Sequence, residues 1–199
     1  MHNITFKQYR NIDLFIFAVL LIISEAVATL ATNVWFNQQP IVISTTLIFI
    51  CIVMMRWNGF AIIPALLGGL VYCIVTKAPA QEYAIYIAGN CMTLLSLLWF
   101  KAFKKEDVKE RPIKLVLFVT SSFLLLWTGR WLISLMFGGG LASIIGYIGK
   151  DSISLLFAVV VMLLMRNVDG MIEDQKAYLF RQQREREQRR NEGDYSDDI

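Results

Sequence analysis

The sequence predicts an all-α integral membrane protein: a six-helix transmembrane bundle with both termini in the cytoplasm. The 199 residues are 56% hydrophobic with a mean hydropathy of +0.54, which is too apolar for an ordinary soluble domain. Apolar segments follow one another through residues 12–165, and most are close to the roughly 20 residues that cross a bilayer as a helix. The Lys and Arg residues are concentrated in the connections that would share one side of the membrane.

Six apolar segments are expected to cross the bilayer: about 12–31, 41–55, 60–76, 83–101, 113–137 and 142–165. The second and third are short for a straight crossing, so we expect them to tilt or to lie inside the bundle. The glycine run 138–140 is expected to form the hinge between the last two segments.

The chain is expected to divide into three parts around this bundle. Residues 1–11 form a cytoplasmic N-terminus, 12–165 the transmembrane domain, and 166–199 a charged cytoplasmic tail. In the tail, 171–190 is rich in Gln, Arg and Glu and predicts a helix, whereas the acidic end 191–199 predicts disorder.

Charge distribution predicts the orientation. With the N-terminus inside, all of the 19 Lys and Arg residues are cytoplasmic except Lys77 in an outer loop and Arg130 and Lys150 within the membrane. The densest basic connection is 101–114. We therefore expect a multi-pass protein of the cell membrane, and specifically of a bacterial plasma membrane.

Polar residues within the apolar segments predict a site. A charge near the bilayer centre costs about 3 kcal/mol, so it needs a partner or a water-filled cavity. In the predicted orientation these residues and several aromatic side chains share the outer half of the membrane: Glu25, Trp35, Asn90, Trp127, Arg130, Trp131, Tyr147, Lys150 and Asp151. The set predicts an outward-facing pocket for a small zwitterionic or heteroaromatic molecule.

The chemistry of the set suggests a role for each kind of residue. Arg130 would bind a carboxylate or phosphate, Glu25 or Asp151 an amine or ring N–H, and the tryptophans an aromatic face. Two alternatives remain open. Glu25–Arg130 and Lys150–Asp151 could pair internally and only fix helix register, and the tryptophans could be interfacial anchors.

Enzymatic and metal chemistry have little support. Cys51, Cys73 and Cys91 lie inside apolar segments without a CxxC motif, and His2 is the single histidine. Gly138-Gly139-Gly140 lacks the Lys-Ser/Thr of a phosphate loop. We therefore expect no enzyme, no cofactor, no metal site, no ATP site and no nucleic-acid partner.

A turn with the sequence Arg56-Trp57-Asn58-Gly59 precedes a third segment that holds Pro64 and Gly68-Gly69. Together with the long first outer loop and the basic loop between segments four and five, this pattern resembles the substrate-binding S-components of energy-coupling factor (ECF) vitamin transporters over about residues 8–166. The resemblance implies capture of a small micronutrient near the outer face, under the first outer loop and against helices four to six.

The resemblance also implies partners: a coupling transmembrane subunit and two ATPases in other chains. Ala18 on the first helix, and Gly68 and Gly69 on the third, are the candidate docking residues, because small residues permit close helix approach. The competing hypothesis is a non-transporting six-helix scaffold of a cell-envelope assembly, similar to the rod-shape protein MreD. In a scaffold the tail and the 101–114 loop would matter, and the polar pocket would not.

Overall fold

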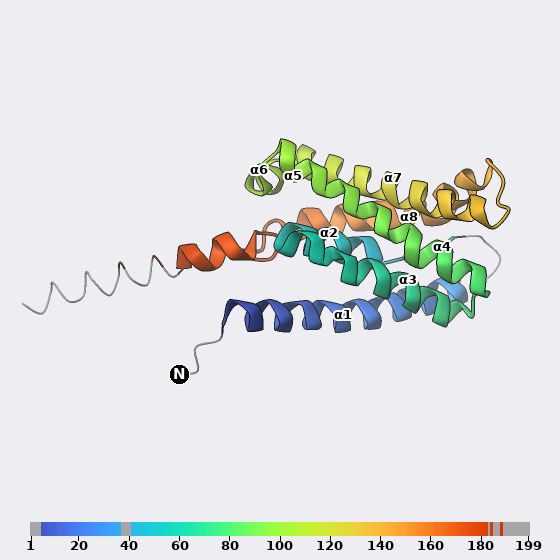
Figure 1. The fold of residues 1–199 in the computed structure, drawn as a ribbon, viewed down its shortest axis with the longest axis horizontal. Coiled ribbons are helices and arrows are strands. Elements are labelled where there is room, and N and C mark those ends of the chain that lie inside the picture. The colour runs from blue at the N-terminus through green and yellow to red at the C-terminus, as the bar shows by residue number, and fades with distance from the viewer. Residues whose placement is uncertain (1–4, 37–40, 183, 185–187, 189–199) are drawn as a thin grey trace, which may run out of the picture.

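The computed structural model describes residues 5–36, 41–182, 184 and 188, and within them every regular element is a helix. The long helices lie along one axis as an elongated bundle (Figure 1). In chain order the elements are α1 (Phe6–Trp35), α2 (Thr46–Trp57), the 3₁₀ helix η1 (Asn58–Ala61), α3 (Ile62–Thr76), α4 (Ala80–Cys91), the 3₁₀ helix η2 (Met92–Leu98), α5 (Trp99–Ala102), α6 (Lys105–Glu110), α7 (Pro112–Met136) and α8 (Ser143–Met165).

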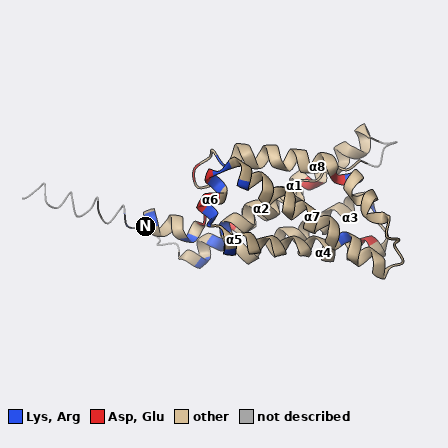
Figure 2. Cartoon of the chain, turned by 90° about the horizontal axis from the view of Figure 1, so that it is seen from above, with Lys and Arg blue, Asp and Glu red and all other residues tan. Residues whose placement is uncertain are grey.

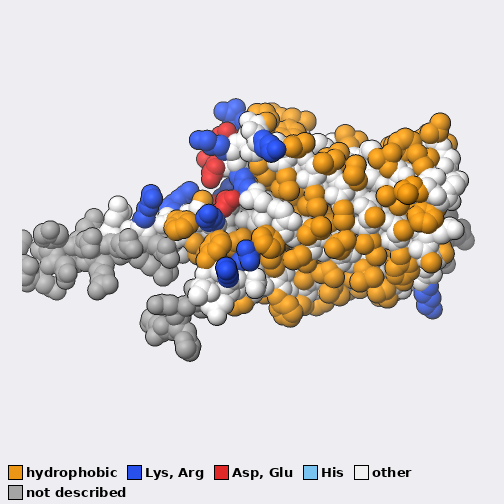
Figure 3. Space-filling model, viewed as in Figure 1, with side chains coloured by type: hydrophobic (Ala, Val, Ile, Leu, Met, Phe, Trp, Pro, Cys, Tyr) orange, Lys and Arg blue, Asp and Glu red, His pale blue; other side chains and the backbone are white. Residues whose placement is uncertain are grey.

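Among the described residues, five helical stretches are long and apolar enough to cross a membrane by length and composition. They are Phe6–Trp35, Thr46–Thr76, Ala80–Ala102, Pro112–Met136 and Ser143–Met165. Hydrophobic side chains cover the flank of the bundle, while charged side chains gather at one end (Figure 3). The predicted class, a helical membrane-embedded protein, is confirmed at this level.

Helix α1 has one buried face and one exposed apolar face. Thr5 caps it through a capping box with Gln8, so the helix begins at Phe6, inside the segment expected to precede the bundle. Phe15 and Val27 are 69% and 61% exposed on the outer face. The buried residues recur every three or four positions, as an amphipathic helix requires: Leu14, Phe17, Leu21, Glu25, Thr29 and Thr32.

The stretch 46–76 is interrupted near its middle. Asn58 adopts φ 54°, and after η1 the chain turns back so that α3 packs beside α2 (Figure 1). Almost every residue of α2 is buried. The second apolar segment was expected from residue 41, but 41–45 is not helical and the helix begins only at Thr46.

Glycines let neighbouring helices approach closely. A Cβ at Gly129 of α7 would lie 2.2 Å from the carbonyl oxygen of Gly89 in α4. A Cβ at Gly69 would lie 2.8 Å from the Tyr86 backbone of α4, and one at Gly68 would lie 2.2 Å from the Thr46 hydroxyl. Both members of the predicted docking pair Gly68-Gly69 are buried inside the chain. They are therefore not accessible to another subunit in this structure.

The connections differ from expectation in two places. Residues 101–114 contain a short helix, α6, and the tail helix begins at 175 rather than 171. That helix is described through 182, and most of 183–199, including the predicted acidic end, lies outside the described residues. The glycine run between α7 and α8 forms a turn with Gly138 at φ 85°.

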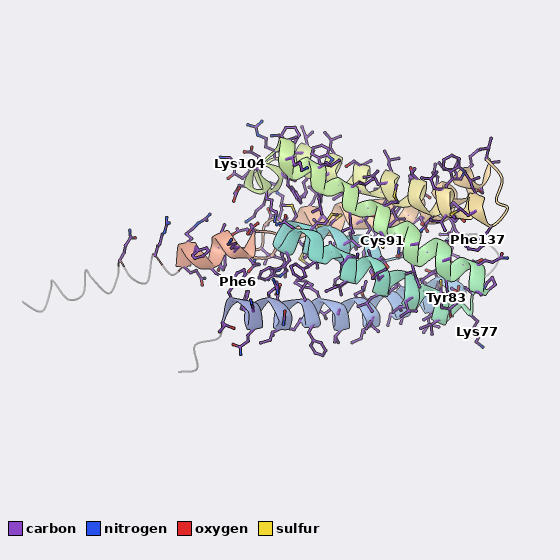
Figure 4. All side chains as sticks on the ribbon, viewed as in Figure 1. Phe6, Lys77, Tyr83, Cys91, Lys104 and Phe137 are labelled. Atoms are coloured by element: carbon purple, nitrogen blue, oxygen red, sulfur yellow. The ribbon has the colours of Figure 1, made fainter. Side chains whose placement is uncertain are left out.

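Charge separates the two ends of the bundle. Lys and Arg residues cluster beside α5, α6 and the start of α1, which we call the basic end (Figure 2). Phe6 and Lys104 lie at this end, whereas Lys77, Tyr83 and Phe137 lie at the opposite end (Figure 4). The structure thus groups the basic connections as the sequence predicts.

Gly129→Ala is expected to lower the free energy of unfolding by about 1–3 kcal/mol, because the new methyl group would overpack the α4–α7 contact. Gly146→Ala is the matched control, since a Cβ there meets nothing within 4 Å. Thermal unfolding in detergent measures both. Equal midpoints for the two variants would contradict the close packing.

Candidate functional site

A buried ion pair joins three helices in the bundle. Arg130 of α7 donates through Nη1 to the Asp151 carboxylate of α8, and through Nε to Asn90 Oδ1 of α4 at 2.9 Å. Arg130 is 4% exposed, Asp151 3% and Asn90 0%. Three residues predicted from sequence are therefore brought together, and the charges of Arg130 and Asp151 neutralise each other.

Tyr86 lies at the centre of this cluster. The Arg130 guanidinium carbon stands 4.4 Å from the centroid of its ring, and the ring of Tyr72 lies 4.4 Å away on α3. Lys150 Nζ donates to the Tyr86 hydroxyl at 3.5 Å. Sequence reasoning missed Tyr86 because a tyrosine in an apolar segment carries no charge, although its one-turn spacing from Asn90 puts both on the same helix face.

Gly89, the residue before Asn90, determines how closely α4 approaches α7. A Cβ at Gly89 would lie 2.7 Å from the Arg130 Cα, so only glycine lets α4 come this near α7. Asn90 also donates to the Ala65 carbonyl of α3 at 3.2 Å. Cys91, the next residue along, is seen near the middle of the bundle's long axis (Figure 4). The ion-pair cluster is therefore deep within the bundle.

Glu25 has a different partner from the one proposed for it. Its carboxylate accepts hydrogen bonds from the backbone N–H of Thr45 at 2.7 Å and of Thr46 at 3.0 Å. The hydroxyls of Ser44 and Thr45 donate at 2.8 and 2.9 Å. The buried acid of α1 thus satisfies the N-terminus of α2, where an anion is favoured.

The two internal pairs considered as an alternative to a pocket are not the pairs that form. Among the described residues neither Glu25–Arg130 nor Lys150–Asp151 forms a salt bridge. Arg130 instead pairs with Asp151 because α7 and α8 pack side by side, whereas Glu25 is already engaged by α2.

The segment 41–45, which follows α1, crosses from Glu25 to α8. Val42 N–H donates to the Lys150 carbonyl at 2.8 Å, and the Ser154 hydroxyl donates to the Val42 carbonyl at 2.9 Å. Ser44 N–H donates to the Ser154 hydroxyl at 2.9 Å. Glu25 is therefore linked to the Lys150–Asp151 region through this segment, a connection that sequence spacing does not reveal.

The four predicted aromatic residues differ in burial and surroundings. Trp127 is buried near Asp151, although its Nε1 has no hydrogen-bond partner in the part of the chain that the structure describes. Tyr147 packs against the Tyr72–Tyr86 cluster. Trp131 is half-buried with an unpaired Nε1 among the described residues. Trp35 ends α1 and is 73% exposed, so it lies apart from the buried cluster.

A second buried cluster lies at the basic end. Arg56 of α2 binds Asp13 of α1 through Nε at 2.9 Å and Nη2 at 2.7 Å, and Trp57 Nε1 donates to the same carboxylate at 2.6 Å. Arg56 Nη1 donates to the carbonyls of Gly170 and Met171. The pairing of Arg56 with Asp13 was not predicted, although an acid inside the first apolar segment is itself a signal that Asp13 needs a partner.

The described part of the tail is held against α6. Lys105 binds Asp174 at 2.8 Å, and Lys109 pairs with Glu173. Asp174 Oδ1 also accepts from the Lys176 N–H at 3.0 Å and so caps the tail helix. Burial lowers the pKa of Lys105, although Asp174 opposes the shift. The charged tail begins as a docked segment.

Ala18, the remaining docking candidate, is half-buried on α1, which packs against α3. In the part of the chain that the structure describes, no group of three or more His, Cys, Asp and Glu residues is placed to hold a metal ion. Comparisons with protein-family models, curated proteins and solved structures give no match to this chain.

Arg130→Gln is expected to destabilise the fold by about 3–5 kcal/mol, because it leaves Asp151 buried and unpaired. Adding Asp151→Asn should restore most of that loss. The matched double variant is Arg130→Gln with Glu25→Gln, whose effects should add within about 0.5 kcal/mol, since these residues share no contact. Equilibrium unfolding in detergent measures the two double variants and the three single variants from which they are built. Strong coupling between Glu25 and Arg130, or none between Arg130 and Asp151, would contradict the assignment.

Proposed function

We propose that the chain is a membrane-embedded binding subunit that captures a small solute from the outer side and works with transport proteins in other chains. The observation that carries the proposal is the polar and aromatic cluster formed inside the bundle by Arg130, Asp151, Asn90, Tyr86 and Lys150. The proposed partners are those of the ECF S-components: a coupling membrane subunit and two ATPases.

Chain lengths support six crossings. Helix α2 contributes about 18 Å and 41–45 about 16 Å more if extended, which together span the roughly 30 Å hydrocarbon core. The 15 residues of α3 and four of η1 reach about 30 Å in the opposite direction. Two short helices can therefore replace the single interrupted stretch 46–76, returning the C-terminus to the side of the N-terminus.

The basic end supports the cytoplasmic placement of both termini. Its connections carry six basic residues over 101–114: Lys101, Lys104, Lys105, Lys109, Arg111 and Lys114. The opposite end exposes Lys77. Such an imbalance is the usual sign of the inner face, and it supports the cytoplasmic placement. The proposed location is the plasma membrane of a bacterium.

Lys150 is the proposed anion-binding group. Arg130 is neutralised by Asp151, whereas Lys150 forms no salt bridge among the described residues and contacts Tyr86 only at 3.5 Å. Tyr72 and Tyr147 offer aromatic surface nearby. A small vitamin-like molecule with a carboxylate or phosphate and a planar ring fits this chemistry. In this proposal Glu25 positions residues 44–46 at the start of α2 and does not contact the solute.

One observation favours the scaffold as a second candidate. The tail is tied to the bundle by Arg56, Lys105 and Lys109, and the deepest charges are already paired. A scaffold needs a rigid inner end and no ligand. It differs from the binding proposal in requiring the tail and not Lys150.

Orientation is tested by single cysteines and a membrane-impermeant maleimide on intact cells. Lys77→Cys and Gly140→Cys should label from outside. Lys104→Cys should label only after permeabilisation, because the 101–114 connection is proposed to be cytoplasmic. The three positions are exposed, so labelling reports sidedness. Labelling of Lys104→Cys in intact cells would overturn the orientation.

Lys150→Met is expected to weaken solute binding at least about tenfold, which corresponds to one charge-assisted hydrogen bond. Native mass spectrometry of the purified protein first identifies a co-purifying small molecule, and calorimetry then measures its affinity. Lys77→Met removes an exposed lysine from the same end and should leave affinity unchanged.

Two outcomes would reject the binding proposal in favour of the scaffold. One is the absence of any small molecule from protein purified natively. The other is a ligand whose affinity is the same in Lys150→Met and the unmodified chain. Unfolding midpoints of both lysine variants control for loss of structure.

A further inference from the structure

A cavity of about 320 Å³ lies at the basic end, apart from the Arg130–Asp151 cluster. Its walls come from α6, from the residues that follow α8, and from the tail segment 172–181. These parts are far apart in sequence and are joined by the pairs Lys105–Asp174 and Lys109–Glu173. The two ion pairs form part of the wall and fix its shape.

Two cations line the cavity without a carboxylate partner among the described residues: Arg166 and Arg181. Arg166 follows the last turn of α8, and its Nη1 is buried without a hydrogen bond in this part of the chain. Its Nε has only a long contact, 3.4 Å, to Asn167 Oδ1. A buried guanidinium nitrogen with no acceptor is costly, and an anion in the cavity would satisfy it.

Tyr178 supplies a neutral donor to the same wall. Its hydroxyl accepts a hydrogen bond from Gln182 Nε2 at 2.8 Å, which leaves the phenolic proton free to donate to a ligand. Two guanidinium groups and one hydroxyl are a suitable set for the oxygens of a phosphate, since arginine forms paired hydrogen bonds to that group.

We propose that this cavity binds the phosphate group of a small molecule, held by Arg166, Arg181 and Tyr178. The volume falls within the range of small-molecule sites, about 300–1,000 Å³. Bound phosphate bridges the end of α8 to the tail helix, so the ligand stabilises the docked tail. The inference does not depend on the outer site or on its solute.

Two acids limit which anions enter. Glu106 and Glu110 line the cavity from α6 and are exposed, so they repel a highly charged ligand. Their presence favours one or two phosphate groups over a long polyanion. They also provide a variant that should strengthen binding without disturbing a buried contact.

The test is calorimetric titration of the full chain with pyrophosphate and with inorganic phosphate, in nanodiscs of neutral lipid. Arg166→Gln should raise the dissociation constant at least about tenfold, the effect of removing one charge-assisted contact. Glu110→Gln should lower it several-fold. Arg184→Gln is the control, because Arg184 is exposed on the tail helix that carries Arg181 but does not line the cavity.

Three results would overturn the proposal: no binding of either probe at millimolar concentration, equal affinity in Arg166→Gln, or an equal loss in Arg184→Gln. If Arg166→Gln does not fold, two other variants test the site. Arg181→Gln should then weaken pyrophosphate binding and Glu110→Gln should strengthen it. Nanodiscs with phosphatidylglycerol separate the two sources of phosphate. Loss of pyrophosphate binding there assigns the site to lipid headgroups, and retained binding assigns it to a soluble molecule.

Discussion

The ion pair between Arg130 and Asp151 decides how α4, α7 and α8 meet. A lone charge inside a bilayer is costly, so neither residue can remain buried without the other. The guanidinium also requires Asn90 and the face of Tyr86, which fixes the rotation of α4 about its axis. Much of the helix packing on this side of the bundle can be understood as the means of bringing these groups within contact.

The need to satisfy a buried charge also explains how α1 and α2 are joined. No cation of the described residues forms a salt bridge with the buried Glu25, yet two backbone N–H groups and two hydroxyls satisfy its oxygens. Those donors belong to the segment that starts α2, so the acid of α1 holds the first connection in place. Ser154 extends the network to α8. A continuous set of polar contacts therefore runs across the bundle.

The helical class and the approximate segments could be predicted from hydropathy, because apolar length is a local property. The gathering of Asn90, Arg130 and Asp151 was also predictable, since each is a polar residue that needs a partner. The identity of the partner was not, because pairing depends on helix rotation and on contacts as close as Gly89 with Arg130. Neutral donors such as Tyr86 carry no signal of charge and were missed for that reason.

Arg56 has a consequence for biogenesis. Residues 170–171 follow all of the long apolar helices that the structure describes. During synthesis the Nη1 group of Arg56 therefore cannot bind these carbonyl groups until the last helix has been made. Asp13 holds the rest of the guanidinium from the start. The tail can therefore bind Arg56 only after the last helix has been made, and an unfinished bundle contains an arginine with half of its hydrogen bonds.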